Sequence, residues 1–289
     1  MENTSCIITL TTDFGTSDVY VGVMKGVILN INPQAQIVDI THDVSQQNIH
    51  EAAFTINAAY RYFPKGTIHV IVVDPGVGSD RQAIVCETEN AFFVCPNNGV
   101  LTYLLQNIET DVDYHKPNAV IIENPAYHLP QVSNTFHGRD IFAPVAAHLS
   151  LGVSLAHIGP PIQNIEQLPI PTVQYLDDTL TGEIIKIDSF GNLTTNISED
   201  IFSSFLFSSA QNTSLEITLT KDVDDLKFEI RIQNIRLKKL NSSYTESEVG
   251  EVLAIINSFG LLEIAINTGN AEASLGVKIG DNVVIHRSG

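Results

Sequence analysis

Basic residues are scarce in this chain of 289 residues. It has 15 lysines and arginines against 33 aspartates and glutamates, which gives a formal net charge of −18 at pH 7. A surface this acidic repels nucleic acid and anionic lipid, so we expect no nucleic acid and no membrane as partners. The charge suits a small cationic substrate, although the need for solubility also explains it.

Cysteine is also scarce, and its spacing excludes the usual redox and metal motifs. The three cysteines, Cys6, Cys86 and Cys95, form no Cys-x-x-Cys pair. Cys6 and Cys95 lie in apolar, strand-like runs, which is typical of buried, reduced thiols. Such thiols favour a cytoplasmic protein, because structural disulfides belong to oxidising compartments.

Long apolar runs are absent as well. No run reaches the roughly 20 apolar residues that span the hydrocarbon core of a bilayer. Residues 1–5 show neither a basic region nor a long apolar segment, so we expect no signal peptide. Hydrophobic residues still make up 44% of the chain and charged residues 17%, which allows a sizeable core and argues against global disorder.

The first half of the chain alternates strand-like and helix-like segments. Helical spacing of apolar residues follows Asp18, which we expect to cap a helix, and recurs over residues 48–63. Strands are expected between these helices, over residues 6–11, 36–40 and 67–73. Strand, helix and strand in succession predict a Rossmann-like α/β domain with a largely parallel sheet.

A change of pattern marks the second half. Residues 159–176 are rich in proline and show no periodicity, which indicates a domain boundary. Beyond it, turn residues separate short strands, expected over residues 182–187, 214–219, 228–232, 252–256, 262–266 and 282–285. This pattern predicts a smaller all-β barrel or sandwich. We therefore predict an α/β domain over residues 1–165, a linker over 166–179 and an all-β domain over 180–289.

Two loops carry the strongest candidate chemistry. Asp74-Pro-Gly-Val-Gly-Ser-Asp-Arg81 follows the third predicted strand, and His137 lies in a second loop, FHGRD. A guanidinium holds an oxygen anion, an imidazole takes or orients a proton, and a carboxylate orients that imidazole or binds the water. The three could be unrelated loop residues. The position of Asp74 at the carboxyl end of a strand, where α/β sheets bind ligands, favours a site that holds and activates water.

Other polar positions allow two interpretations each. Asp13 follows the first strand and could bind a ribose diol, or it could only close an Asx-turn. The segment from Asp188 to Asn192 could bind an amine and a purine edge, or form an ordinary β-turn. The chain lacks Gly-x-Gly-x-x-Gly, a phosphate-loop lysine and Gly-x-Ser-x-Gly, so neither phosphate cradling nor a serine nucleophile is supported.

Short histidine motifs give little support for a metal. His42 and Asp43 are neighbours after a strand, where adjacent side chains point in opposite directions. His50 lies near a helix start, and His69 lies inside an apolar strand as an expected core histidine. We therefore predict no metal site.

The segments together resemble the S-adenosylmethionine hydroxide adenosyltransferase family, relatives of the fluorinases and chlorinases. The matching motifs follow the expected order along nearly the whole chain: TTDFGTSD, VVDPGVGSDR, PNNG, FHGRD, DSFGN, and the run from NSFG to GNAEASLG. The resemblance implies an α/β N-terminal domain and a C-terminal β-barrel. It implies a homotrimer that binds substrate between the N-terminal domain of one subunit and the C-terminal domain of its neighbour.

The reaction implied is attack of water, as a hydroxide equivalent, on the 5′ carbon of S-adenosylmethionine, which yields adenosine and L-methionine. S-adenosylmethionine is the substrate, and no cofactor is implied. Asp74, Arg81 and His137 match the family's water-activating triad. The substrate contacts implied are Asp13 for the ribose hydroxyls, Asp18 and Asp188 for the methionine ammonium, Asn192 for adenine, Ser258 for the methionine portion, and the backbone of Ala271 for adenine.

The chain departs from its halogenating relatives at three places. Those enzymes carry Tyr and Thr within the loop that here reads Asp74-Pro-Gly-Val-Gly. His137-Gly138 stands where those enzymes carry Tyr-Ser, so the serine that helps to hold halide is missing. Phe259 stands where they carry an arginine for the methionine carboxylate, which leaves recognition of that carboxylate open. A halogenase is the nearest alternative in chemistry, and His137-Gly138 argues against it.

Two further alternatives differ in class. The protein could bind adenosine or S-adenosylmethionine as a sensor with little turnover, in which case incubation would leave the ligand unchanged. It could also be a calcium-dependent nucleoside hydrolase. The loop over residues 12–18 lacks the adjacent paired aspartates that such a metal site needs.

Overall fold

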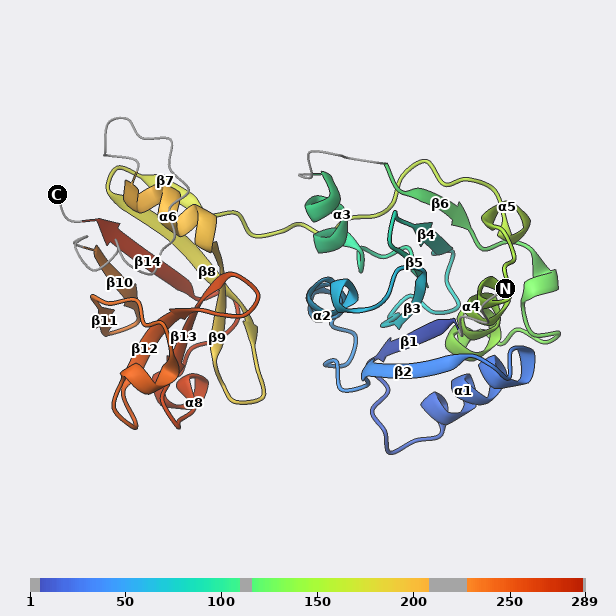
Figure 1. Cartoon of the computed structure of the whole chain (residues 1–289), viewed down its shortest axis with the longest axis horizontal. Coiled ribbons are helices and arrows are strands. Elements are labelled where there is room, and N and C mark those ends of the chain that lie inside the picture. The colour runs from blue at the N-terminus through green and yellow to red at the C-terminus, as the bar shows by residue number, and fades with distance from the viewer. Residues whose placement is uncertain (1–5, 110–115, 208–227, 288–289) are drawn as a thin grey trace. The chain divides into compact units, whose positions relative to one another are not determined.

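The chain forms two compact units, residues 1–168 and residues 169–289 (Figure 1). The computed structural model describes residues 6–109, 116–207 and 228–287. Each unit has its own hydrophobic core.

The first unit is built on a six-stranded sheet with the order β2-β1-β3-β5-β4-β6. β1 pairs in parallel with β2 and β3, β3 pairs in parallel with β5, and β4 is antiparallel to β5 and β6. The prediction of a largely parallel sheet is confirmed. The strands are β1 (Ile7–Thr12), β2 (Gln36–Thr41), β3 (Thr67–Val72), β4 (Ala83–Glu87), β5 (Ala91–Pro96) and β6 (Asn118–Ile121).

Helices cover both faces of this sheet. α1 and α4 share one core cluster with alternate residues of β3, and α2 and the start of α3 share the other. Every residue of β3 is buried, as its almost continuous apolar run predicts for a strand between two layers of helices. The helices are α1 (Tyr20–Ile31), α2 (Ile49–Ala59), α3 (Thr102–Glu109), α4 (Ala143–Ser150) and α5 (Leu155–Ile158).

A side chain caps the start of α2 but not the start of α1. α2 begins after Asn48, whose side chain accepts a hydrogen bond from the backbone of Glu51 at 3.1 Å. The predicted cap of α1 is wrong: that helix starts at Tyr20, its N-cap residue is Val19, and no side chain caps it. Asp18 therefore lies outside the helix, where it lines the pocket described below.

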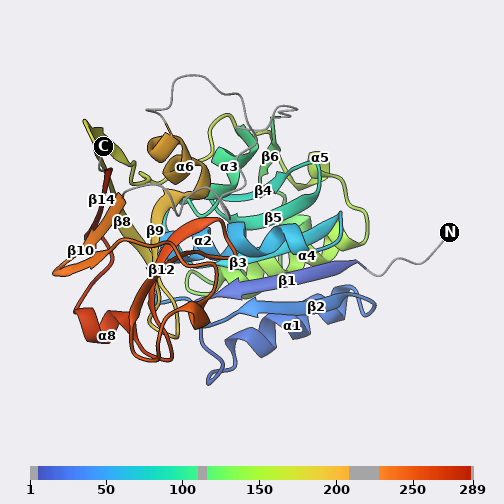
Figure 2. The same ribbon diagram turned by 60° about the vertical axis from the view of Figure 1, so that its left-hand side comes forward.

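The second unit is an antiparallel, nearly closed barrel (Figure 2). Its strands follow the order β11-β10-β14-β8-β9-β13-β12, and β7 pairs with β8 outside this path. A bridge between Asn241 and Ile255 brings the segment after β11 against β12, so the two ends of the path approach each other. The strands are β7 (Gln174–Leu176), β8 (Thr179–Ile187), β9 (Leu193–Ser198), β10 (Phe228–Ile232), β11 (Ile235–Leu237), β12 (Val252–Ile256), β13 (Leu261–Ile266) and β14 (Asn282–Arg287).

The sequence prediction missed several elements here. β9 reads as polar because of its threonines, yet Thr194 and Thr195 are buried in the barrel. α6 (Glu199–Phe207) packs Phe202, Phe205 and Leu206 into the core within only nine residues, too short a run to show clear periodicity. β7 lies within the predicted linker, and the predicted strand over residues 214–219 lies outside the described residues.

Candidate active site

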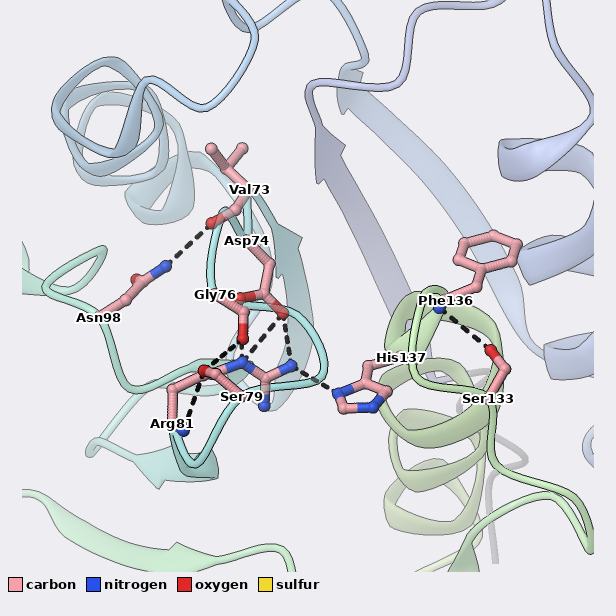
Figure 3. A network of polar contacts seen from close by, with 9 residues as sticks. All are labelled: Val73, Asp74, Gly76, Ser79, Arg81, Asn98, Ser133, Phe136 and His137. Carbon is pink, nitrogen blue, oxygen red and sulfur yellow. Dashed lines mark hydrogen bonds and ion pairs between the residues drawn. The ribbon is translucent and has the colours of Figure 1, made fainter.

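The site begins at the carboxyl end of β3, where Val73 and Asp74 leave the sheet. Asn98, from the turn after β5, donates its side-chain amide to the carbonyl of Val73 at 3.0 Å. The Ser79 hydroxyl donates to the carbonyl of Gly76 at 2.6 Å and closes the loop that follows (Figure 3). These bonds fix the backbone on both sides of the Asp74 carboxylate.

Arg81 and Asp74 form a buried ion pair across this loop. The Nε atom of Arg81 lies 2.9 Å and 3.0 Å from the two carboxylate oxygens of Asp74, and Nη2 donates to Oδ2 as well. The side chains are 11% and 5% exposed. Because several charge-assisted bonds hold the two planar groups, the guanidinium has little freedom to turn.

His137 completes the group. The Nη2 atom of Arg81 lies 2.7 Å from Nδ1 of His137, although the two residues are 56 positions apart (Figure 3). Arginine has donors only, so Nδ1 must accept this bond with its lone pair. The neutral imidazole therefore carries its proton on Nε2.

The surroundings of His137 favour that neutral form. Burial lowers the pKa of His137 from 6.5, and the positive charge of Arg81 lowers it further. The carboxylates of Asp74 and Asp140 and the backbone of Ser133 act in the opposite direction without reversing the shift.

Asp140 holds the segment that carries His137. It is completely buried, and it accepts hydrogen bonds from the backbone of Ser133 at 2.8 Å and from Nε of Arg139 at 2.6 Å. The Ser133 hydroxyl in turn accepts from the backbone of Phe136 at 3.1 Å. His137 directly precedes a π-helical turn, Gly138–Phe142, so its position depends on a folded loop and not on a flexible tail.

A pocket of about 340 Å³ opens in front of these groups. Arg81 is not among the lining residues, so its influence on a water in the pocket passes through the two side chains it holds. The lining residues are Asp13, Phe14, Asp18, Tyr20, Gln46, Gln47, Val72, Asp74, Pro75, Val77, Thr135, Phe136, His137 and Gly138. The pocket thus brings together four predicted site residues of the first unit: Asp13, Asp18, Asp74 and His137. Arg81 contacts Asp74 and His137 without lining the pocket itself.

Asp13 is held in the pocket by a distant segment. Its Oδ2 atom accepts a hydrogen bond from the backbone of Gln47 at 2.8 Å. The hydroxyl of Thr12 accepts from the backbone of Phe14 at 3.3 Å and closes the local turn. The local turn is therefore closed by Thr12 and not by the Asp13 carboxylate, and ribose binding by Asp13 stays a prediction.

The four remaining predicted residues lie in the second unit. Asp188 accepts hydrogen bonds from the backbones of Phe190 and Asn192, both at 2.9 Å, and from the Asn192 side chain at 3.0 Å. The β-turn interpretation is therefore correct, and the turn also aligns the two side chains. Ala271 starts a short helix, α8 (Ala271–Leu275), that contacts this turn through a hydrogen bond from Glu272 to the carbonyl of Gly191 at 3.0 Å. Ser258 is exposed on the turn between β12 and β13.

Two histidines outside the site, His69 and His42, contact threonine hydroxyls of β1. His69 is completely buried, with Nδ1 2.7 Å from the Thr9 hydroxyl, as expected for a core histidine. His42 bonds to the Thr12 hydroxyl at 2.9 Å and lies 3.0 Å from Asp39.

No cluster of three or more His, Cys, Asp or Glu suited to a metal ion occurs within residues 6–109, 116–207 and 228–287. The same residues contain no helix that is both long and apolar enough to cross a membrane.

Sequence reasoning missed the aromatic part of the pocket. Phe14, Tyr20 and Phe136 line it, and each lies within two positions of a predicted site residue. Their position next to predicted site residues could have identified them as pocket residues from the sequence. Asn98 lies in the quoted PNNG motif, but its support of Val73 depends on a contact 25 positions away.

Comparison with known proteins decides the family. Residues 8–159 match the SAM hydroxide adenosyltransferase N-terminal domain, and residues 182–284 match the C-terminal domain. The chain belongs to the S-adenosylmethionine hydroxide adenosyltransferase family.

Members of this family resemble the chain over almost its full length. A protein of Methanocaldococcus jannaschii named (R)-S-adenosyl-L-methionine hydrolase is 35% identical, over 96% of this chain and 95% of its own. One of Salinispora arenicola with the same name is 34% identical, over 96% of each chain. A fluorinase of Actinopolyspora mzabensis is 28% identical, over 98% of this chain and 97% of its own. The crystal structure of an uncharacterized conserved protein from Thermotoga maritima superposes with a TM-score of 0.83, at 38% identity, over 97% of this chain and 100% of that one.

Proposed function

We propose that this protein is an enzyme that hydrolyses S-adenosyl-L-methionine to adenosine and L-methionine. The observation that carries the proposal is the contact between Arg81 and Nδ1 of His137, beside the Asp74 carboxylate at a pocket wall. This contact leaves Nε2–H of His137 as a donor next to the Asp74 carboxylate as an acceptor. In the proposal, these two groups together bind and polarise one water. Hydrolase relatives of more than 30% identity support the same reaction.

The chemistry needs no further group at the sulfur atom. The water oxygen forms a bond to the 5′ carbon, the bond from that carbon to sulfur breaks, and its electron pair stays on sulfur. The sulfonium becomes a neutral thioether, and one proton is released. A neutral leaving group needs no general acid, so we propose a reaction without metal or cofactor.

The triad residues have separate roles in this proposal. The Asp74 carboxylate accepts a proton from the attacking water, and Nε2–H of His137 donates to its oxygen and directs it toward the 5′ carbon. Arg81 positions both, because it holds the carboxylate and fixes the tautomer of the imidazole. Fixed alignment of reacting atoms, rather than strong basicity, is what such a site supplies.

The residues proposed to contact the substrate are those implied by the motifs that this chain shares with its family. Asp13 and Asp18 line the pocket and would hold the ribose hydroxyls and the ammonium group. The contacts from the second unit would be Asp188 at the ammonium, Asn192 and the backbone of Ala271 at adenine, and Ser258 at the methionine portion. Phe259 is half-exposed and uncharged, so the methionine carboxylate would not be bound by charge at that position.

The names of the relatives refine the substrate. Sulfonium sulfur is a stereocentre, and the hydrolases of Methanocaldococcus jannaschii and Salinispora arenicola are named for the (R) form. We propose that this protein also acts on the (R) epimer. An enzyme limited to the (R) epimer would leave the other epimer intact.

We also propose a cytoplasmic homotrimer with the site shared between subunits. The predicted contacts are divided between the two units of the chain, which suits a site that needs both. The cysteines Cys6, Cys86 and Cys95 are all free, which suits a reducing compartment.

The packing around Gly138 disfavours the serine that the halogenating relatives carry at this position, and so argues against halogenase activity. A Cβ atom there would lie 3.1 Å from the sulfur of Met24 and 3.1 Å from the ring of Phe136. A serine at this position therefore requires both side chains to move. We expect adenosine release to be independent of added halide.

Substitution of the triad tests the proposal. We expect Asp74→Ala, Arg81→Lys and His137→Ala each to lower kcat for adenosine release by about 10²-fold or more, because each removes proton transfer or alignment. The measurement is chromatography after incubation with each epimer, and His50→Ala, an exposed histidine outside the pocket, is the matched control. Full activity in all three variants would contradict the triad, and ligand retained unchanged by the wild type would indicate a sensor.

A further inference from the structure

Three aromatic rings form one wall of the pocket. Phe14 lies 5.7 Å from Tyr20 and 5.7 Å from Phe136, and Tyr20 lies 5.1 Å from Phe136, measured between ring centroids. The rings come from the loop after β1, the start of α1 and the segment before the π-helical turn. We call these three residues the aromatic wall.

The aromatic wall is more exposed than a core cluster. Phe14 and Phe136 pack partly against the core of the first unit, but Tyr20 remains 44% exposed. All three line the pocket together with Asp13 and Asp18. Aromatic surface and two carboxylates thus line the same pocket.

Phe136 already lies against a cation. The guanidinium of Arg139 lies 5.3 Å from the centre of its ring. Asp140 pairs with Arg139, with Nε and Oδ1 2.6 Å apart, and so offsets the charge of that guanidinium. A second cation that approaches the wall from the pocket therefore meets little repulsion from Arg139.

We infer that the aromatic wall binds the sulfonium centre of the substrate. The inference rests on the proposed function, in which Asp13 holds the ribose and Asp18 the ammonium group. The sulfonium lies between these two groups along the substrate, so it must lie between the two carboxylates that line the pocket. A sulfonium has no N–H or O–H, and its charge is spread over its methyl and methylene groups. Aromatic faces bind cations of this kind, as they bind quaternary ammonium groups.

This assignment predicts where the wall acts in the reaction. The positive charge disappears as the bond to sulfur breaks, so the attraction is stronger in the bound substrate than in the product. The wall therefore raises the affinity for the sulfonium over the neutral thioether and assists product release. It contributes to affinity and slightly opposes the chemical step, because part of the charge has left sulfur in the transition state.

Paired ligands and paired substitutions test the wall. The ligands are S-adenosylmethionine and S-adenosylhomocysteine, which lacks the methyl group and the charge. Binding is measured by calorimetry in a His137→Ala background, in which turnover should be about 10²-fold slower or more, with chromatography to check that the substrate is still intact. Tyr20→Leu removes the exposed ring, Tyr20→Phe keeps it, and Tyr62→Leu, at a tyrosine 80% exposed outside the pocket, is the surface control.

We expect Tyr20→Leu to weaken S-adenosylmethionine binding by roughly 5- to 30-fold, the range of a cation–π contact. Binding of S-adenosylhomocysteine should change less than twofold, and Tyr20→Phe and Tyr62→Leu should match the parent. Equal weakening of both ligands, or no weakening of either, would overturn the inference. A wild type that releases no adenosine from S-adenosylmethionine would instead contradict the proposed function.

Discussion

Arg81 determines the geometry of the site at the scale of single residues. Its Nε atom lies 2.9 Å from Asp74, and its Nη2 atom lies 2.7 Å from His137. A lysine has one nitrogen and cannot make both contacts with the same alignment. The protonation state of His137 is thus set by a neighbour that can only donate.

The pH dependence follows from that arrangement. A proton added to His137 would place an N–H at Nδ1, facing the N–H of Arg81, and would break the contact. Burial and Arg81 lower the pKa of His137 from 6.5, so the neutral form persists to more acidic pH than usual. We expect kcat/KM to fall only below pH 6.5, by about tenfold per pH unit past the pKa. Activity that rises on acidification would contradict this role of His137.

At the scale of helices and strands, the position of an element was predictable from the sequence where all its residues share one environment, such as complete burial. The apolar run of β3 predicts burial on both faces, and the structure confirms it. β9 was missed because the barrel buries Thr194 and Thr195, which look like surface residues in the sequence. The predicted strand over residues 214–219 stays a prediction. Tertiary burial of polar side chains is a property that local pattern does not encode.

His69 in β3 predicts an acid-sensitive stability. It is completely buried, bonded to Thr9 and stacked on Phe93, with ring centroids 5.2 Å apart, and burial lowers its pKa to about 4. The unfolded chain, with a histidine pKa near 6.5, binds the proton first as the pH falls. The stability from neutral His69 is therefore complete above pH 6.5 and declines as the pH falls toward 4.

The comparison of wild type with His69→Gln measures this term. Between pH 7.5 and 4.5 the wild type should lose about 2–3 kcal/mol more unfolding free energy than the variant. Urea unfolding followed by circular dichroism is suitable, since the chain has no tryptophan. The variant itself should be less stable at pH 7.5, because it lacks the imidazole packing. Equal acid losses in the two proteins would show that His69 does not titrate as its burial requires.

At the scale of the whole molecule, the motifs predicted the family but not the geometry of the pocket. The triad was predicted from two loops, and the structure brings Arg81 and His137 into contact across 56 positions, yet the atom of His137 that faces Arg81 could not be predicted from the sequence. The aromatic wall brings Phe136 against Phe14 and Tyr20, which lie more than 110 positions earlier, and only the folded domain does this. The roles assigned to the substrate-binding residues remain predictions.

Complementation tests whether subunits share the site. We expect Asp74→Ala to disable the part of the site in the first unit and Asp188→Ala the part in the second. If each site combines units from neighbouring subunits, co-expressed variants in random trimers should recover about a quarter of the wild-type sites. Each variant alone should be nearly inactive and is the control. Recovery of no activity would place each site within one chain.

The central claim is that water attacks the 5′ carbon of S-adenosylmethionine. The most direct measurement is turnover of the (R) epimer in water enriched in oxygen-18, with mass spectrometry of both products. The account predicts one heavy oxygen in adenosine, at the 5′ position, and none in methionine. Unlabelled adenosine, label in methionine, or no release of adenosine at all would contradict it.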